Sequence, residues 1–274
     1  MRVVWLTDLH LDFVRPPKER FDFYTEIMGE DPDAIFLTGD TGESDNLWQY
    51  IGELRDLSDC LYYVLGNHDY YGATFAEVRS KATSRTDTKR NELWLPRSGP
   101  KELAEGVGVV GVDGWYDAQC GYPHSNVRLA DWGGRGVIDL IGLGQKTFLD
   151  RTERLEKLGK DEAFKLELQL NKVKDLGWKK LFVLCHVPPF PDACFYDGKK
   201  SEPDFLPFFT WVAGGNSLMD FALKNPTIQT TVLCGHTHGK GEYRANDNLL
   251  VKVGGWNPKE KSYGFPRVQE VIEL

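Results

Sequence analysis

The chain has 274 residues, of which 41% are hydrophobic and 27% are charged. These proportions are those of an ordinary globular protein and exclude a disordered chain, a coiled coil or a collagen-like fibre. The 33 lysines and arginines against 41 aspartates and glutamates leave a formal net charge of −8, which argues against nucleic acid or an anionic membrane surface as a partner.

The sequence predicts neither a secretory signal nor a transmembrane helix. The apolar run Arg2–Leu6 leads straight into Thr7-Asp8 and is too short for a secretory signal. Nowhere does an apolar run reach the roughly 18 residues that a transmembrane helix needs. The five cysteines are odd in number and form no C-x-x-C pair, as is typical of a reduced intracellular chain. We therefore expect a cytoplasmic protein with no membrane association.

The first third of the chain alternates short apolar runs with amphipathic segments. The apolar runs predict strands over residues 2–6, 33–37 and 61–65. The amphipathic segments predict helices over residues 18–29, 46–57 and 73–84. Repeated β-α-β order implies parallel strands joined by right-handed crossovers.

The middle of the chain is less regular. A strand is predicted over residues 107–112 and another over 181–185, and the amphipathic residues 145–176 predict one or two helices. The segment 113–145 is rich in Gly, Trp and Tyr without a period, and the segment 187–215 is rich in proline. Long irregular segments of this kind in a compact protein are usually functional loops, so we expect lid-like insertions at both places.

Four further strands are predicted near the end of the chain, over residues 231–234, 241–245, 249–253 and 268–272. Short turns join the last three, which favours an antiparallel arrangement. Because the sequence shows neither an internal repeat nor a domain linker, we expect residues 1–274 to form a single domain.

Polar, ligand-type side chains follow five of the predicted strands. The five blocks are Asp8-Leu9-His10, Gly39-Asp40, Gly66-Asn67-His68-Asp69, His186 and Gly235-His236-Thr237-His238. In an open α/β sheet, ligands bind beyond the carboxyl ends of the strands, so these side chains should converge on one place. Oxygen and imidazole ligands together suit Mn, Fe or Zn.

The number of these residues points to two metal ions. Seven ligand-type side chains are too many for one tetrahedral zinc but fit two ions that share a carboxylate. Two ions about 3.5–4 Å apart clamp the attacking and leaving oxygens of an in-line displacement at phosphorus. They also lower the pKa of a trapped water towards neutrality, which creates a hydroxide nucleophile.

The five blocks in this order resemble the calcineurin-like metallophosphoesterases, and none departs from the family pattern. The resemblance covers residues 8–238, nearly the whole chain. It implies an α/β fold in which a two-sheet β-sandwich is flanked by helices, as four layers in the order α/β/β/α. This agrees with the alternation of predicted strands and helices.

The resemblance also implies a role for each residue. Asp8, His10 and His238 would hold one metal ion, and Asp40 would bridge the two. Asn67, His186 and His236 would hold the second ion. His68 would not bind metal but would face the substrate phosphate and stabilise or protonate the leaving oxygen, and Asp69 would orient His68 or its loop.

We therefore expect a metal-dependent hydrolase that cleaves a small phosphodiester, such as a cyclic nucleotide or nucleotide derivative, by attack of a metal-bridged hydroxide. The cofactors would be two divalent or trivalent ions of Mn, Fe or Zn. Phosphomonoesters, including phosphoproteins, are the second substrate class, and nucleic acid is the third. Two rival functions are a non-catalytic metal-binding scaffold and a hydrolase of non-phosphate bonds. The sequence carries no signal for an oligomeric state.

Two further groups of residues are candidates for substrate contact. Trp115, Tyr116 and Trp132 could line a cleft and stack on a nucleobase, or could simply pack the loop that contains them. His124 could touch substrate from the same segment, or could be an exposed loop residue without a role.

Overall fold

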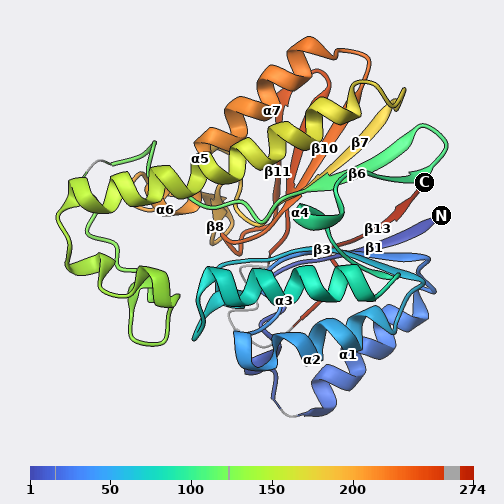
Figure 1. The fold of residues 1–274 in the computed structure, drawn as a ribbon, viewed down its shortest axis with the longest axis horizontal. Coiled ribbons are helices and arrows are strands. Elements are labelled where there is room, and N and C mark those ends of the chain that lie inside the picture. The colour runs from blue at the N-terminus through green and yellow to red at the C-terminus, as the bar shows by residue number, and fades with distance from the viewer. Residues whose placement is uncertain (16, 123, 256–265) are drawn as a thin grey trace.

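The computed structural model describes residues 1–15, 17–122, 124–255 and 266–274, so the predicted lid-like segment 113–145 is described apart from residue 123. Two large sheets lie face to face with helices on both outer sides (Figure 1). One sheet has the strand order β13-β1-β2-β3-β4, and the other has the order β11-β12-β10-β7-β6-β5. The predicted four-layer α/β/β/α fold is therefore confirmed.

The first sheet contains the opening third of the chain and the last strand. Its strands are β1 (Arg2–Leu6), β2 (Ala34–Thr38), β3 (Cys60–Val64), β4 (Glu92–Trp94) and β13 (Glu270–Glu273). Strands β1 to β4 run parallel, as predicted, while β13 pairs antiparallel with β1. The helices on its outer side are α1 (Pro17–Gly29), α2 (Ser44–Arg55) and α3 (Phe75–Thr88) (Figure 1).

The second sheet follows from residue 101 onward. Its strands are β5 (Lys101–Ala104), β6 (Val107–Gly111), β7 (Lys180–Leu184), β10 (Gln229–Cys234), β11 (Gly241–Asn246) and β12 (Leu249–Val253). The long helix α5 (Phe148–Val173) and α7 (Val212–Lys224) cover its outer face (Figure 1). The predicted helical region 145–176 is thus one helix.

Shorter elements complete the described chain. These are α4 (Leu95–Ser98), α6 (Leu206–Phe209), the small hairpin β8 (Phe195–Tyr196) and β9 (Lys199–Lys200), and the 3-10 turns η1 (Leu11–Phe13), η2 (His68–Tyr70), η3 (Ala130–Trp132), η4 (Ile138–Leu140), η5 (Leu143–Gln145) and η6 (Pro191–Ala193).

The space between the two sheets is filled by large apolar side chains. Trp5, Phe36 and Phe182 are at most 2% exposed, and the rings of Phe36 and Phe182 meet across the two sheets at 5.7 Å. Every residue of β2 is buried, because the other sheet covers one face of the strand and helices cover the opposite one. This burial explains why the central strands read as continuous apolar runs rather than as alternating patterns.

The predicted antiparallel tail is correct for the pairing of β11 with β12 and wrong for the last strand, β13. Strands β11 and β12 pair antiparallel, but β12 also pairs parallel with β10. Strand β13 leaves this sheet and pairs with β1 in the other one, where Arg2 lies opposite Glu273. The last strand therefore joins the two ends of the chain, and Leu274 donates a backbone hydrogen bond to Met1 at 2.9 Å.

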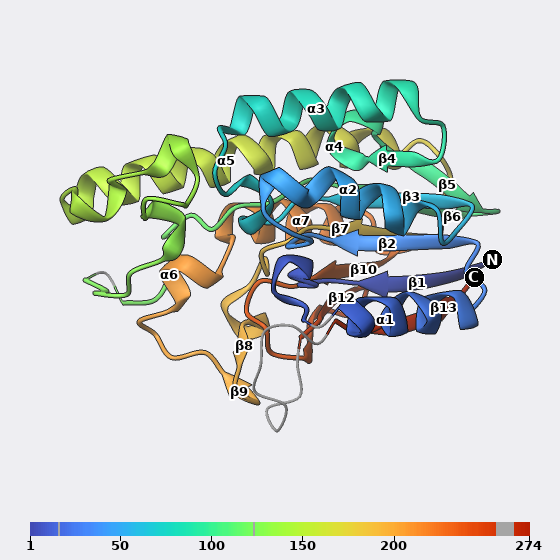
Figure 2. The same ribbon diagram turned by 90° about the horizontal axis from the view of Figure 1, so that it is seen from below.

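The carboxyl ends of the central strands all point to one side of the molecule, away from the two termini (Figure 2). The loops that follow β1, β2, β3, β7 and β10 meet on that side. None of the helices in the described ranges combines the length and the apolar character that crossing a bilayer requires.

Candidate metal centre

The loops after the five central strands bring the predicted ligands together. Backbone hydrogen bonds tie neighbouring loops to each other: Asp8 donates to Gly39, His10 to Asp40, and Gly235 to His186, at 2.9–3.1 Å. The first two bonds join the loops of β1 and β2, and the third joins those of β7 and β10. The loops therefore hold one another in place, and the side chains that they carry share a single buried region.

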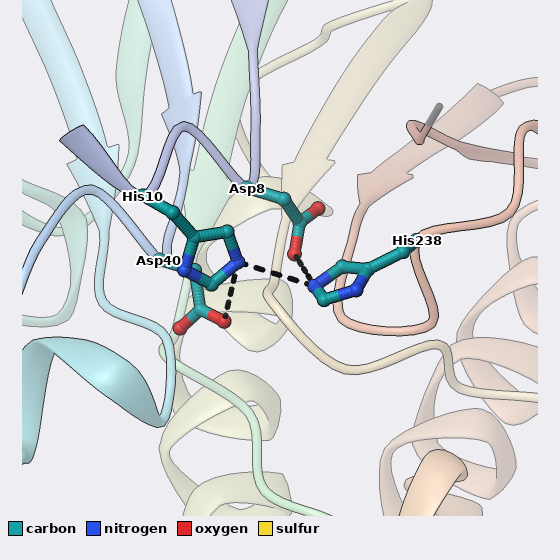
Figure 3. A group of neighbouring side chains, drawn as sticks. All are labelled: Asp8, His10, Asp40 and His238. Carbon is teal, nitrogen blue, oxygen red and sulfur yellow. Dashed lines mark hydrogen bonds and ion pairs between the residues drawn. The ribbon is translucent and has the colours of Figure 1, made fainter. Parts of the chain in front are cut away.

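Asp8, His10, Asp40 and His238 form the first cluster (Figure 3). Each offers one ligand atom, and these atoms all lie within 4.8 Å of one another. The Nε2 atoms of His10 and His238 are 3.2 Å apart, and Nε2 of His238 is 3.4 Å from Oδ1 of Asp8. Two carboxylates and two imidazoles at these distances can surround one cation.

Asn67, His186 and His236 form the second cluster. Oδ1 of Asn67 lies 3.1 Å from Nε2 of His186 and 3.0 Å from Nδ1 of His236. The other nitrogen of each ring donates to a backbone carbonyl, Nδ1 of His186 to Thr38 and Nε2 of His236 to Phe208. In the neutral form each imidazole consequently turns a lone pair towards Asn67 Oδ1, which also carries lone pairs. A cation satisfies such a set of converging acceptors, so these residues fit a metal ion.

Asp40 lies between the two clusters. Its Oδ2 is 3.7 Å from Nε2 of His10 and 3.4 Å from Nε2 of His186. Its Oδ1 accepts the backbone N–H of His68 at 2.9 Å. One carboxylate therefore contacts both imidazole sets, as a ligand shared between two ions must.

The backbone at the site is strained. Eight non-glycine residues of the described chain have positive φ, and five of them are predicted ligands: Asp8, His10, Asp40, His236 and His238. Such a conformation costs of order 1–3 kcal/mol per residue and persists where the surroundings impose it. The positive φ at each of these residues turns its side chain away from the direction of the strand and into the site.

Burial is the largest single influence on the pKa values of the ligand-type residues. It lowers the pKa of His10 to about 3 and that of His236 to about 4. Burial also opposes charge on His186, but the Asp40 carboxylate, together with Asp8 and the Thr38 carbonyl, outweighs burial and raises the His186 pKa to about 10. Burial likewise opposes ionisation of Asp40, yet the neighbouring imidazoles, His186 first, hold the pKa of that carboxyl well below its ordinary value. The site thus favours a carboxylate with positive charge beside it, which is the pattern of a cation site.

His68 lies next to the metal cluster but is held differently. Its ring stacks on Tyr71 with centroids 4.2 Å apart and meets the ring of His10 edge-on at 4.7 Å. Its buried Nδ1 has no hydrogen-bond partner among the residues that the structure describes. The ring is positioned by packing against Tyr71 and His10.

Asp69 supports the loops rather than the ring of His68. Its buried carboxylate accepts the backbone N–H groups of four residues at 2.8–3.1 Å; they are Asp40, Thr41, Gly42 and Gly66. Burial first, and then the charge on Asp40, raise the pKa of Asp69 to about 8. The three bonds from Asp40, Thr41 and Gly42 join the loop after β2 to the loop after β3, and so fix Asp40 relative to Asn67. The bond from Gly66 lies within the loop after β3.

Gly66 is required because its neighbours leave no room for a side chain. A Cβ at this position would collide with the Asp40 carboxylate and approach His186 Cε1 to 2.8 Å. We expect Gly66→Ala to destabilise the protein by about 1–3 kcal/mol, as overpacking does, and to reduce its manganese content. Urea unfolding and elemental analysis would measure both. Gly134→Ala is the matched control, because a Cβ there meets nothing within 4 Å; wild-type stability in Gly66→Ala would contradict this interpretation.

The sequence analysis missed two residues at the site. Asp131, in η3, accepts a hydrogen bond from Asn67 Nδ2 at 2.7 Å. Tyr71 carries the stacking face for His68. Tyr71 closely follows the third motif, so its proximity was a usable signal, whereas nothing in the sequence around Asp131 marks it.

Of the two alternatives for the aromatic residues of the irregular segment, loop packing is the correct one. Trp115, Tyr116 and Trp132 are 2%, 0% and 5% exposed, so they pack the interior of their loop. The sequence could not decide this, because it does not reveal which loop faces are covered. His124 is exposed, with Tyr122 and Phe148 as its ring neighbours, and does not join either ligand cluster.

Solved structures share this fold. A dimetal phosphatase from Danio rerio is 14% identical and superposes with a TM-score of 0.58 over 93% of this chain and 87% of that one. The TT1561 protein of Thermus thermophilus is 15% identical, with a TM-score of 0.53 over 94% of this chain and 90% of that one. At these identities the likeness shows the fold alone.

No curated protein sequence matches the chain. The sequence model of the calcineurin-like phosphoesterases, in contrast, matches residues 1–240, which include all five motifs. The fold, the convergence of carboxylates and imidazoles at the strand ends, and this match agree. The chain therefore belongs to the calcineurin-like phosphoesterase family of metal-dependent phosphoric ester hydrolases.

Proposed function

We propose that this enzyme hydrolyses a small phosphodiester, such as a cyclic nucleotide or a nucleotide derivative, at a dinuclear metal centre. The observation that carries the proposal is the pair of adjoining ligand clusters joined by Asp40 Oδ2, which lies 3.7 Å from His10 Nε2 and 3.4 Å from His186 Nε2. A single ion would not need ligands from both sides of this carboxylate.

The ligand roles follow from the two clusters. One ion would be held by Asp8, His10 and His238 and the other by Asn67, His186 and His236, with Asp40 shared. When bound, such ions neutralise charge on phosphate oxygens and lower the pKa of a water molecule that can attack phosphorus.

The protein's own contribution to the chemistry centres on His68. In the protonated form its ring can donate a proton to the departing oxygen, while Tyr71 stacked against one face limits its rotation. The backbone N–H of His68 bonds to Asp40, which keeps the proton donor at a constant place relative to the metal centre. Positioning of this kind is what general acid catalysis requires.

The side chains that pair with the ligand carboxylates include no cationic group other than histidine among the described residues. In the described ranges, Asp8 and Asp40 form ion pairs with histidines and with no lysine or arginine. A phosphodiester carries one negative charge, whereas a monoester carries up to two and benefits more from additional cationic side chains. The net charge of −8 further disfavours a nucleic acid substrate.

Two chromogenic substrates test the proposal. With Mn²⁺ added, we expect kcat/KM for bis(p-nitrophenyl) phosphate to exceed that for p-nitrophenyl phosphate by at least about tenfold, or 1.4 kcal/mol of transition-state stabilisation. The reverse preference would assign the enzyme to the phosphomonoesters instead. A manganese-loaded protein that hydrolyses neither substrate would favour the non-catalytic scaffold.

A further inference from the structure

Asp131 lies far from the five motifs in sequence but at the centre of the site's hydrogen bonding. It belongs to η3, in the irregular segment after β6, and is 2% exposed. Its carboxylate accepts three hydrogen bonds: from Asn67 Nδ2 at 2.7 Å and Tyr71 Oη at 2.8 Å on Oδ1, and from Tyr116 Oη at 3.0 Å on Oδ2. All three partners are donors, so both oxygens of the carboxylate are engaged.

The bond to Asn67 selects one orientation of its amide. A carboxylate only accepts, so it must face the Nδ2 end, and this directs Oδ1 towards His186 and His236. Rotating the amide by half a turn would set its oxygen against the carboxylate and its N–H₂ group against the metal side. The structure thus assigns Asp131 a role that rests on the proposed dinuclear function: we propose that it is a positioning residue that keeps Asn67 Oδ1 on the metal.

The same oxygen of Asp131 also positions Tyr71, the residue on which the ring of His68 stacks. Tyr71 donates its hydroxyl to Oδ1, and its ring stacks on the His68 ring with an interplanar angle of 24°. One carboxylate oxygen therefore positions a metal ligand and, through Tyr71, the general acid. Because both are fixed by one atom, their relative placement is fixed as well.

The backbone around Asp131 is rigidly attached to the loop that it positions. Val137 donates to the Asp131 carbonyl at 2.9 Å, and it forms an antiparallel bridge with Tyr71. Gly72 donates to Gly136, and Ile138 donates to Ala73, both at 3.0 Å. These bonds keep this part of the irregular segment from moving independently of the third motif, as a positioning role demands.

Manganese binding to Asp131→Ala, compared with wild type, tests this role directly. Removal of a residue that orients a metal ligand typically weakens metal binding about 10–100-fold, so calorimetry should show the second Mn²⁺ weakened by that factor. The first ion should bind as in wild type, because Asp131 contacts none of its ligands. By electron paramagnetic resonance, the spin-coupled signal of paired Mn²⁺ should give way to that of a single ion.

Three variants separate positioning from general stability. Tyr116→Phe removes the donor on Oδ2 but leaves the bond to Asn67, and should retain the coupled signal. Asp131→Asn keeps an acceptor oxygen for Asn67 and Tyr71, and should bind the second ion more tightly than Asp131→Ala does. Asp131→Leu, which keeps the branched shape of the side chain without an acceptor, replaces Asp131→Ala if that variant does not fold.

The outcomes are distinguishable. Equal affinity for the second ion in wild type and in the folded variant without an acceptor would overturn the positioning role and leave the dinuclear function intact. A wild-type protein that takes up fewer than two ions would overturn the dinuclear function and the positioning role together.

Discussion

Replacing Asp40 with asparagine should remove the enzyme's activity and its metal together. Asp40 Oδ2 lies beside both imidazole sets, so loss of its charge weakens both ion sites at once. The ions supply several kcal/mol of transition-state stabilisation, so we expect kcat/KM to fall by about 10³-fold or more. Elemental analysis and steady-state kinetics on the same preparation would measure the two effects.

The fold should survive the Asp40→Asn change. Asparagine retains an oxygen that can accept the backbone N–H of His68, which Asp40 Oδ1 accepts at 2.9 Å. Asp220→Asn is the matched control, because that exposed carboxylate pairs with Lys224 on the surface of α7. An Asp40→Asn protein that still holds two ions would contradict the shared-ligand assignment.

Replacing His68 with alanine should separate catalysis from metal binding. The ring approaches His10 but offers no atom to either ligand cluster, so metal content should remain that of wild type. Loss of a general acid typically costs about 10²–10⁴ in rate, and kcat should fall by that factor. Metal analysis and steady-state kinetics on the same preparation would show whether His68 acts in catalysis without binding metal.

The leaving group gives a sharper test of the same variant. An alkoxide such as the ribose oxygen of a cyclic nucleotide needs a proton to depart, whereas p-nitrophenolate departs readily without one. The His68→Ala loss should therefore be larger for the cyclic nucleotide than for bis(p-nitrophenyl) phosphate. His124→Ala, an exposed histidine beside Phe148, should behave as wild type. Equal losses for both substrates, or loss of metal from His68→Ala, would be incompatible with His68 as the acid.

The parallel strands and the site that they carry were readable from local pattern. Strands β1, β2 and β3 begin and end within one residue of their predicted bounds, because apolar runs this short, bounded by polar residues, have the length of a strand buried on both faces rather than that of a helix. Ligand-type residues follow the same end of each strand, and parallel strands place those ends together. The clustering of the five motif blocks was therefore predictable without knowledge of the sheet order.

Helix α7 shows where local pattern fails. Its first turn contains Gly214 and Gly215, which disfavour a helix, and the sequence analysis placed its start in a loop. In the structure, Gly214 lies against the Trp211 indole and Gly215 against the Pro189 carbonyl, where a Cβ would collide. Close packing outweighs the intrinsic preference here, and only the tertiary structure reveals the contact.

What the sequence determined by itself is the type and order of the first three strands and of the helices that follow them, together with the identity of the ligand-type residues, because these depend on neighbours along the chain. The tertiary structure alone decided the partner of β13, the burial of Trp115 and the role of Asp131. Asp131 and Asn67 are 64 residues apart, and their 2.7 Å bond exists only because the irregular segment folds back onto Tyr71 and Gly72. Contacts of this kind depend on how separate loops are placed relative to one another, and no periodicity in a linear sequence records that placement.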